Sequence, residues 1–251
     1  MTVDWSLLTS ELALWRAENR PLPIWWRDDD AIEDTPELTT LLTLSERLNC
    51  PVHLAVIPKP ATPGLVTACR NVKNAVPVVH GWTHQSHAPK GEKKAEFGHP
   101  RAAALNETSA ALARMRDLFG ENLLEMFVPP WNRIDNSVVA GLGAQGYRIL
   151  STFTPRKARE VAGMVQINTH VDPIFWRGGG GLADPDLLIA EIVKLLKDRQ
   201  SGETDAAEPL GFLTHHLVHD AAIWSFTERC LSVLLDGGAT PINLLITKEI
   251  P

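Results

Sequence analysis

Short apolar runs alternate with stretches of helical character along most of the chain. Seven runs have the length and the β-branched or aromatic content of strands, and an eighth is weaker. We predict strands at residues 23–27, 52–57, 76–79, 126–128, 147–153, 165–171 and 211–215, with 242–247 as the possible eighth. No repeat of fixed period links them.

Helical stretches lie between the predicted strands. Thr35 and Asp184 are each followed by proline, so each predicts a helix N-cap with proline at the first helical position. Residues 101–118 and 220–235 predict further helices. Because strand and helix alternate seven or eight times without a compositional break, we expect one domain over residues 1–251. Its parallel sheet would most simply form a (β/α) barrel.

The composition excludes several classes of protein. The chain is 44% hydrophobic and 22% charged, and its net charge of -6 argues against broad binding to nucleic acid or to anionic membranes. No apolar stretch approaches the roughly 20 residues that span a bilayer. The N-terminal segment spaces Leu7, Leu8, Leu12 and Trp15 like one helix face and lacks the pattern of a signal peptide. We therefore predict a cytoplasmic protein, whose oligomeric state the pattern leaves open.

The three cysteines are scattered along the chain and odd in number: Cys50, Cys69 and Cys230. This spacing argues against a disulfide framework. We expect small buried hydrophobic side chains in a reducing compartment.

Two histidines four residues apart, His80 and His84, follow the third predicted strand. On one helical turn both imidazoles would project from the same face and could reach a single ion. A carboxylate from another strand end would complete a two-His-one-carboxylate site, whose open positions suit a catalytic divalent metal.

Other polar residues also follow predicted strands. Residues 28–30 are three aspartates after the first strand, and a Pro-Pro-Trp-Asn segment at 129–132 follows the fourth. His170 and Asp172 end the sixth strand, and residues 215–216 are two histidines at the end of the seventh. The carboxyl ends of the strands share one face of a parallel barrel, so we expect these residues to converge on one pocket.

Five elements, in this order, resemble the polysaccharide deacetylases of carbohydrate esterase family 4. They are an Asp-Asp pair after the first strand, a His-x-x-x-His pair after the third, a Pro-Pro-aromatic turn after the fourth, an Asp-x-x-x-Trp segment and a final Leu-x-His. The resemblance runs from about the first predicted strand to the seventh. It implies a distorted (β/α) barrel of seven or eight parallel strands, and the metal-dependent hydrolysis of an N- or O-acetyl group on a sugar.

The resemblance also implies a metal site. Asp30, His80 and His84 match the family's ligands for Zn²⁺ or a similar divalent ion, with Gly81 in place of the usual hydroxyl residue. The ion would polarise the acetyl carbonyl and activate its bound water.

The same carry-over implies Asp29 as general base and His215 as general acid. Two alternatives stay open. The aspartate pair could be shifted by one residue, with Asp28 as base and Asp29 as ligand. His216 could replace His215, because adjacent residues on a strand point to opposite faces.

Five further residues lie beside these motifs and are candidates for binding the substrate. An indole can stack on the apolar face of a sugar ring. The candidates are Trp82, Pro130, Trp131, Asp172 and Trp176.

Two positions depart from the family pattern. Val128 stands where the family has an arginine, and Phe175 where it has an aspartate. In the family these charged residues pair and help to hold the base. Losing both leaves no uncompensated buried charge. Substitutes could be the cations Arg27, Arg133 and Arg177, or the hydrogen-bonding groups Asp172 and His170.

The polar stretch 88–100 predicts a solvated loop, with a lid over the substrate as the second interpretation. Together these patterns predict a metal-dependent deacetylase, a hydrolase of carbon-nitrogen bonds other than peptide bonds. Its substrate would be an acetylated sugar, an oligosaccharide or a related small molecule, with no nucleic-acid or membrane partner. The alternatives are hydrolysis of non-peptide C–N bonds in small amides, and a catalytically inactive barrel that binds carbohydrate.

Overall fold

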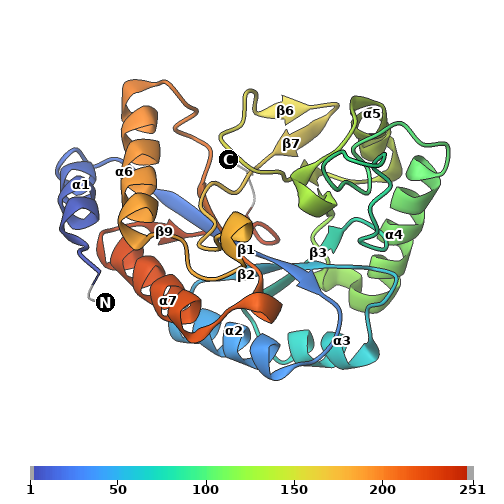
Figure 1. Ribbon diagram of the computed structural model, residues 1–251, viewed down its shortest axis with the longest axis horizontal. Helices are drawn as coiled ribbons and strands as arrows, with labels where there is room; N and C mark the ends of the chain where they lie inside the picture. The colour runs from blue at the N-terminus through green and yellow to red at the C-terminus, as the bar shows by residue number, and fades with distance from the viewer. Residues whose placement is uncertain (1–2, 248–251) are drawn as a thin grey trace.

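A curled, mostly parallel sheet forms the centre of the computed structural model, which describes residues 3–247 (Figure 1). Its strands lie in the order β6-β7-β5-β4-β3-β2-β1-β8, with β9 beside β1, and only β6 and β7 pair antiparallel. The strands are β1 (Pro23–Ala31), β2 (Val52–Val56), β3 (Ala75–His80), β4 (Met126–Val128), β5 (Ile149–Leu150), β6 (Glu160–Val161), β7 (Met164–Gln166), β8 (Leu210–Thr214) and β9 (Thr240–Pro241).

An irregular segment after β7 closes the gap between β5 and β8. Isolated parallel bridges join Thr169 to Phe153 on one side and Val171 to Phe212 on the other. The Leu213 amide donates to the Val171 carbonyl at 2.8 Å. The predicted distorted (β/α) barrel is therefore confirmed, and its distortion lies at this closure.

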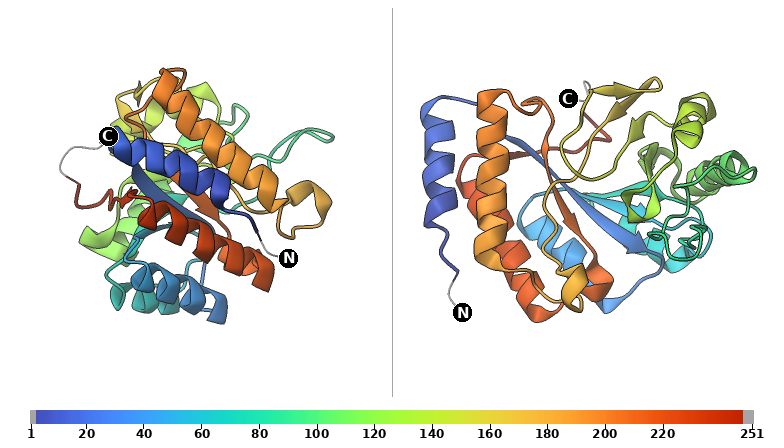
Figure 2. Two further views of the ribbon diagram at one scale, coloured as in Figure 1. Left: turned by 90° about the vertical axis from the view of Figure 1, so that its left-hand side faces the viewer. Right: turned by 45° about the horizontal axis from the view of Figure 1, so that its top comes forward.

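Helices cover the outside of the sheet, and α1 packs against α6 and α7 (Figures 1 and 2). They are α1 (Ser6–Ala17), α2 (Pro36–Arg47), α3 (Pro63–Arg70), α4 (Ala104–Phe119), α5 (Asn136–Gln145), α6 (Pro185–Ser201) and α7 (Ala221–Asp236). Both predicted caps are confirmed, because the side chains of Thr35 and Asp184 accept hydrogen bonds from the first turns of α2 and α6. No helix within residues 3–247 is long and apolar enough to cross a membrane.

Three predicted strands need correction. Strand 147–153 is regular only over the two residues of β5, and strand 165–171 only over β7, which forms a hairpin with β6. Residues 242–247 do not form a strand: the Asn243 side chain accepts from the Leu245 amide, and its carbonyl accepts from Thr247. Asn243 thus turns the chain immediately after β9.

The two faces of the sheet bury different side chains. Trp25 belongs to a cluster inside the barrel, with partners such as Val78 and Met126, whereas Trp26 packs in the larger cluster that includes the helices. This alternation also turns Arg27 inward, on the same face as Trp25. The cysteines are free and buried as predicted.

Gly211 provides a test of the barrel closure. A Cβ there would lie 2.5 Å from the Asn168 carbonyl oxygen and 2.7 Å from the Thr169 Cα, both backbone atoms of the closing segment. We expect Gly211→Ala to lower the free energy of unfolding by about 2 to 3 kcal/mol through this overpacking. Urea unfolding measures the change. Gly64→Ala, where a Cβ meets neighbours only at 3.6 Å, is the control and should stay within about 1 kcal/mol of the parent chain; equal effects would contradict the proposed crowding.

Candidate active site

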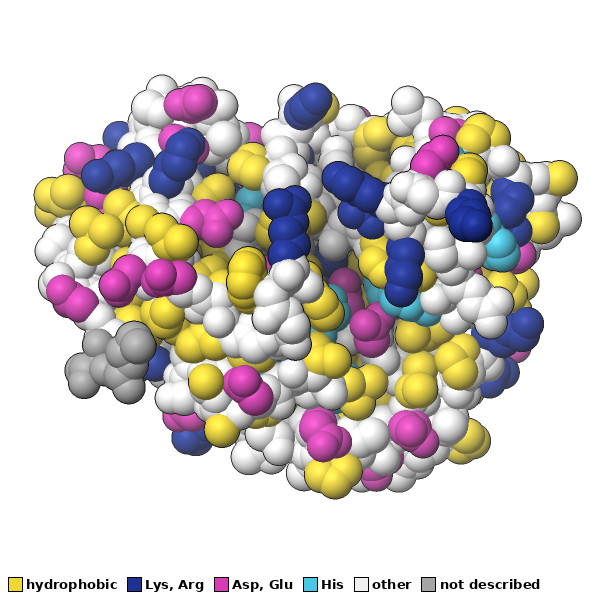
Figure 3. All heavy atoms as spheres, in the orientation of Figure 1, with side chains coloured by type: hydrophobic (Ala, Val, Ile, Leu, Met, Phe, Trp, Pro, Cys, Tyr) yellow, Lys and Arg dark blue, Asp and Glu magenta, His cyan; other side chains and the backbone are white. Residues whose placement is uncertain are grey.

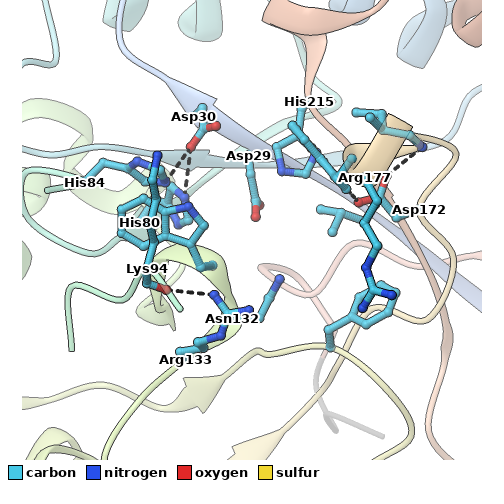
Figure 4. Close-up of a pocket in the computed structure, with 15 residues that line it drawn as sticks. Asp29, Asp30, His80, His84, Lys94, Asn132, Arg133, Asp172, Arg177 and His215 are labelled. Atoms are coloured by element: carbon cyan, nitrogen blue, oxygen red, sulfur yellow. Dashed lines mark hydrogen bonds and ion pairs between the residues drawn. The ribbon is translucent and has the colours of Figure 1, made fainter. Parts of the chain in front are cut away.

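A cavity of about 950 Å³ opens at the carboxyl ends of the strands. Residues from β1, β3, the closing segment and β8 lie on its wall, as the sequence predicted for a parallel barrel (Figure 4). Acidic and histidine side chains gather at the middle of this face, with lysines and arginines around them (Figure 3).

The end of β1 directs two consecutive aspartates into the cavity. In a regular strand Asp29 and Asp30 would point to opposite faces. Instead, the pairing of β1 with β2 shifts register between Asp28 and Ala31, and Asp30 has a φ of 78°. This irregularity re-aims Asp30, so that both carboxylates line the same cavity.

Arg27 holds Asp29 from inside the barrel. Its Nε lies 2.8 Å from one oxygen of the Asp29 carboxylate, and its Nη2 donates to the other at 3.0 Å. The same guanidinium donates to the Asn132 side chain at 2.7 Å, to Ser151 Oγ at 2.8 Å and to the Thr152 carbonyl at 3.2 Å. Of the three candidate cations for the base, Arg27 makes the contact. Its neighbours fix where the Asp29 carboxylate points.

Asp30, His80 and His84 form a group that could hold a metal ion, with their candidate ligand atoms all within 4.8 Å of one another. The Nε2 atoms of both histidines lie 3.1 Å from Asp30 Oδ1. His80 Nδ1 lies 3.0 Å from the Val128 carbonyl, to which it can only donate, so its Nε2 is left to coordinate. Burial opposes ionisation of Asp30, but the two histidines hold its pKa well below the usual range. Carboxylate and imidazole donors with one open side fit a catalytic Zn²⁺.

The histidine pair does not lie on a helical turn, so that expectation is wrong. His80 is the last residue of β3, and the chain bends irregularly to His84, which has a φ of 58°. The imidazoles meet because this bend turns back over the strand end, with ring centroids 5.1 Å apart.

Glu96 shapes that bend from the following loop. Its side chain accepts hydrogen bonds from the amides of Trp82, Thr83 and His84 at 3.1, 2.7 and 3.2 Å, and from the Thr83 hydroxyl at 2.7 Å. Only 1% of Glu96 is exposed, which corrects the interpretation of its stretch as wholly solvated. Sequence reasoning missed this residue, because one buried glutamate among lysines and glycine looks like a polar loop.

Gly81 is required where the family has a hydroxyl residue. Its φ is 57°, and a Cβ would lie 2.3 Å from the Glu96 carboxylate and 2.6 Å from the Pro130 ring. A side chain at this position would displace the carboxylate that organises the bend.

His215, rather than His216, lies on the cavity wall. Its ring makes a T-shaped contact with the Trp176 indole, with the ring centroids 4.8 Å apart. Among the described residues its buried Nδ1 has no hydrogen-bond partner. Asp172 lies on the same wall and accepts from the Trp176 indole at 2.8 Å. Burial raises the pKa of Asp172, and His215 partly opposes that shift.

Asp28 and His216 pair with each other behind the cavity. His216 Nδ1 lies 2.5 Å from one oxygen of Asp28, while the other oxygen accepts from the Thr214 hydroxyl at 2.6 Å and the His216 amide at 3.0 Å. Both side chains are fully buried and neither lines the cavity. The geometry therefore favours Asp29, Asp30 and His215 over the shifted alternatives, and gives the buried pair the task of anchoring the end of β8.

Three of the five predicted substrate residues line the cavity: Trp131, Asp172 and Trp176. The other two lie outside its lining: Trp82 packs against the core with Lys59 over its ring, and Pro130 is buried.

Trp131 has a left-handed backbone, with a φ of 57°. Its ring lies 4.3 Å from that of His84, centroid to centroid. A non-glycine residue in this conformation is uncommon and is often found at functional sites.

His170 does not reach the base. Its Nδ1 accepts from the Gly211 amide at 2.8 Å and its Nε2 lies 3.2 Å from the buried Glu208. It therefore belongs to the barrel closure and not to the cavity.

No protein-family model matches the sequence, and no curated protein matches it. Solved structures of family 4 carbohydrate esterases do share its fold. The Streptomyces lividans family 4 carbohydrate esterase in complex with acetate is 13% identical, with a TM-score of 0.55 over 88% of this chain and 92% of that one. The Bc1960 peptidoglycan N-acetylglucosamine deacetylase is 13% identical, with a TM-score of 0.57 over 89% and 86%.

A third similar structure is a mutant of BA3943, described as a family 4 pseudoenzyme with restored enzymatic activity. It is 12% identical, with a TM-score of 0.55 over 89% of this chain and 66% of that one. At these identities the likeness shows the fold alone. It confirms the resemblance drawn from the motifs as a resemblance in fold.

Substituting Glu96 tests how the bend supports the candidate ligands. We expect Glu96→Gln to weaken Zn²⁺ binding about 10- to 100-fold, because the amide replaces an acceptor by a donor facing backbone N–H groups. Isothermal titration calorimetry of the metal-depleted protein measures the affinity. Glu92→Gln, an exposed position in the same loop, is the matched control. Unchanged affinity in Glu96→Gln would show that the bend holds without this carboxylate.

Proposed function

We propose that this chain is a metal-dependent deacetylase that hydrolyses the acetyl group of an N- or O-acetylated sugar or a related small molecule. One observation carries the proposal: Asp29, fixed by Arg27, lies in one cavity with the Asp30, His80 and His84 group and with His215. A base, a metal-ligand set and an acid are the groups that acetyl hydrolysis needs.

In this proposal Asp30, His80 and His84 hold Zn²⁺ or a similar divalent ion. When bound, the ion supplies Lewis acidity to the acetyl carbonyl and to a water molecule. Asp29 accepts the proton of the attacking water. Arg27 keeps the Asp29 carboxylate aimed at the cavity through two contacts, so the base does not need the charged residues that Val128 and Phe175 replace.

His215 is the proposed general acid. It would donate a proton to the nitrogen or oxygen that leaves the acetyl group. Its place on the cavity wall with Asp172 and its T-shaped contact with the Trp176 ring support this role. Trp131 and Trp176 offer apolar surfaces on which a sugar ring could pack.

The fold likeness supports a sugar as the substrate. The similar structures include a family 4 carbohydrate esterase and a peptidoglycan N-acetylglucosamine deacetylase. The pseudoenzyme among them makes an inactive carbohydrate-binding barrel the alternative, and the retained Asp29 and His215 argue against it.

The first test follows acetate release from N-acetylated mono- and oligosaccharides by the Zn²⁺-loaded protein. We expect Asp29→Asn to lower kcat by about 100- to 10,000-fold, since it removes the base. Asp34→Asn, an exposed carboxylate outside the cavity, is the control and should keep its activity. Because Asn at 29 leaves the buried Arg27 charge without its partner, unfolding by urea is measured alongside.

His215→Gln supplies a second variant that breaks no ion pair, since the ring nitrogens of His215 form none among the described residues. It should lose activity while its thermal unfolding and Zn²⁺ content match the parent chain. Sugar binding without acetate release from the parent chain would favour the inactive barrel. Ammonia release from small amides would favour the alternative function, hydrolysis of non-peptide C–N bonds in small amides.

Removing the metal should abolish acetate release, and Zn²⁺ should restore it. His84→Ala is expected to bind less than a tenth of the parent's Zn²⁺ at equal free metal, because one of three ligands is gone. Metal analysis after dialysis measures this content. The exposed His87→Ala is its control, and equal content in both variants would refute the ligand assignment.

A further inference from the structure

Three basic side chains line the cavity without an acidic partner: Lys94, Arg133 and Arg177. None of them forms an ion pair with a carboxylate among residues 3–247. Elsewhere several cations are paired, for instance Arg101 with Glu107 and Arg116 with Glu125. What distinguishes Lys94, Arg133 and Arg177 is that all three line one cavity, in a chain that carries more acids than bases.

The carboxylates of the cavity are already engaged by other groups. Asp29 is held by Arg27, and Asp30 lies between the candidate histidine ligands. Asp172 accepts from the Trp176 indole and from the Ile174 amide at 3.0 Å. The three cations at the rim thus keep their charge available for a ligand.

The three cations come from different segments and surround the cavity opening. Lys94 lies in the loop after the histidine pair, Arg133 follows the Pro130–Asn132 turn, and Arg177 lies in the Trp176–Gly178 turn. In Figure 4, Lys94 and Arg133 stand on one side of the site and Arg177 on the other. A ligand in the cavity would meet positive charge from both sides.

Arg133 is partly oriented before any ligand binds. Its Nη1 donates to the Lys94 carbonyl at 2.7 Å, which leaves its other N–H groups free for a ligand. Arg133 and Asn132 also line a second cavity of about 650 Å³, to which Lys93 contributes as well. The guanidinium therefore stands where the two cavities meet, which gives room for a substituent beyond the sugar ring that carries the acetyl group.

From these positions we infer that the substrate is an acetylated sugar that carries an anionic oxygen group, a phosphate or a carboxylate, bound by Arg133 with Lys94 and Arg177. This inference rests on the proposed deacetylase function. Guanidinium groups bind such oxyanions through charge-assisted, often bidentate hydrogen bonds. Unpaired cations around a cavity also attract an anionic ligand before contact.

The test compares three substrates with the Zn²⁺-loaded protein: N-acetylglucosamine, N-acetylglucosamine 6-phosphate and N-acetylmuramic acid. We expect kcat/KM to be at least 10-fold higher for one of the two anionic sugars than for the neutral one, and this preference to fall as salt is raised. The anionic sugar that is preferred identifies phosphate or carboxylate as the group. Equal kcat/KM for all three, or a preference for the neutral sugar, would overturn the inference.

Substitution of the cavity arginines tests where the anionic group of the substrate binds. Arg133→Gln and Arg177→Gln should lower kcat/KM for the preferred anionic sugar about 10- to 100-fold and change it less than about twofold for N-acetylglucosamine. Arg70→Gln, an exposed arginine at the end of α3 outside the cavity, is the matched control and should leave all three substrates unchanged. A loss that is equal for neutral and anionic sugars in the cavity variants would refute selective anion binding.

Direct binding separates this inference from the proposed function. Calorimetry with metal-depleted protein, so that no ion captures the phosphate, should give tighter binding of N-acetylglucosamine 6-phosphate or N-acetylmuramic acid than of N-acetylglucosamine. Arg133→Gln should remove the difference. If this holds while no sugar releases acetate, the proposed function fails and the anion site stands. If acetate is released but neither the rate nor the binding favours an anionic sugar, the proposed function stands and the anion site is refuted.

Discussion

The buried pair of Arg27 and Asp29 is the interaction on which the rest of the site depends. A guanidinium with no exposure inside a barrel is tolerated only when a carboxylate and further acceptors surround it. Here Asp29 takes two contacts, and the remaining N–H groups are satisfied by Asn132, Ser151 and the Thr152 carbonyl. These acceptors follow β4 and β5, so one cation joins the carboxyl end of β1 to the opposite side of the barrel.

This arrangement links the base to the aromatic wall of the cavity. Asn132, which accepts from Arg27, follows Trp131, and both residues have left-handed backbones. The Trp131 ring in turn packs against His84, a candidate metal ligand. The orientation of the base, the shape of the cavity and the position of one imidazole are thus set through a single chain of contacts, which begins at a buried charge.

Sequence patterns predicted the parts of this site that follow from strand periodicity. The barrel, the convergence of the strand ends and the two helices that begin with proline follow from alternation and capping signals that are local in sequence. Arg27 and Asp29 also share a strand face by their spacing of two, which is a signal for their pairing.

What the patterns missed depends on backbone conformation and on long-range contacts. The positive φ of Asp30, which turns it to the same cavity as Asp29, cannot be read from residue type, because residues 28–30 are all aspartate. Neither does the burial of Glu96, which is fixed by backbone amides more than ten residues away. The spacing of four between His80 and His84 predicts a helical turn, but the observed bend brings two imidazoles together at the same spacing.

The departure from the family pattern at position 128 has a physical explanation. At position 128 the site uses only the backbone: the Val128 carbonyl accepts from the Gly81 amide at 3.0 Å and faces His80 Nδ1 at the same distance. Its side chain is therefore free to be apolar, and it packs in the barrel interior. With Arg27 placed directly against the base, an arginine at 128 would add a second buried cation and require a second carboxylate to balance it. The apolar Val128 avoids that desolvation cost, because one cation already neutralises one carboxylate at the base. Phe175 is half-exposed and nothing in the structure explains its replacement of an aspartate.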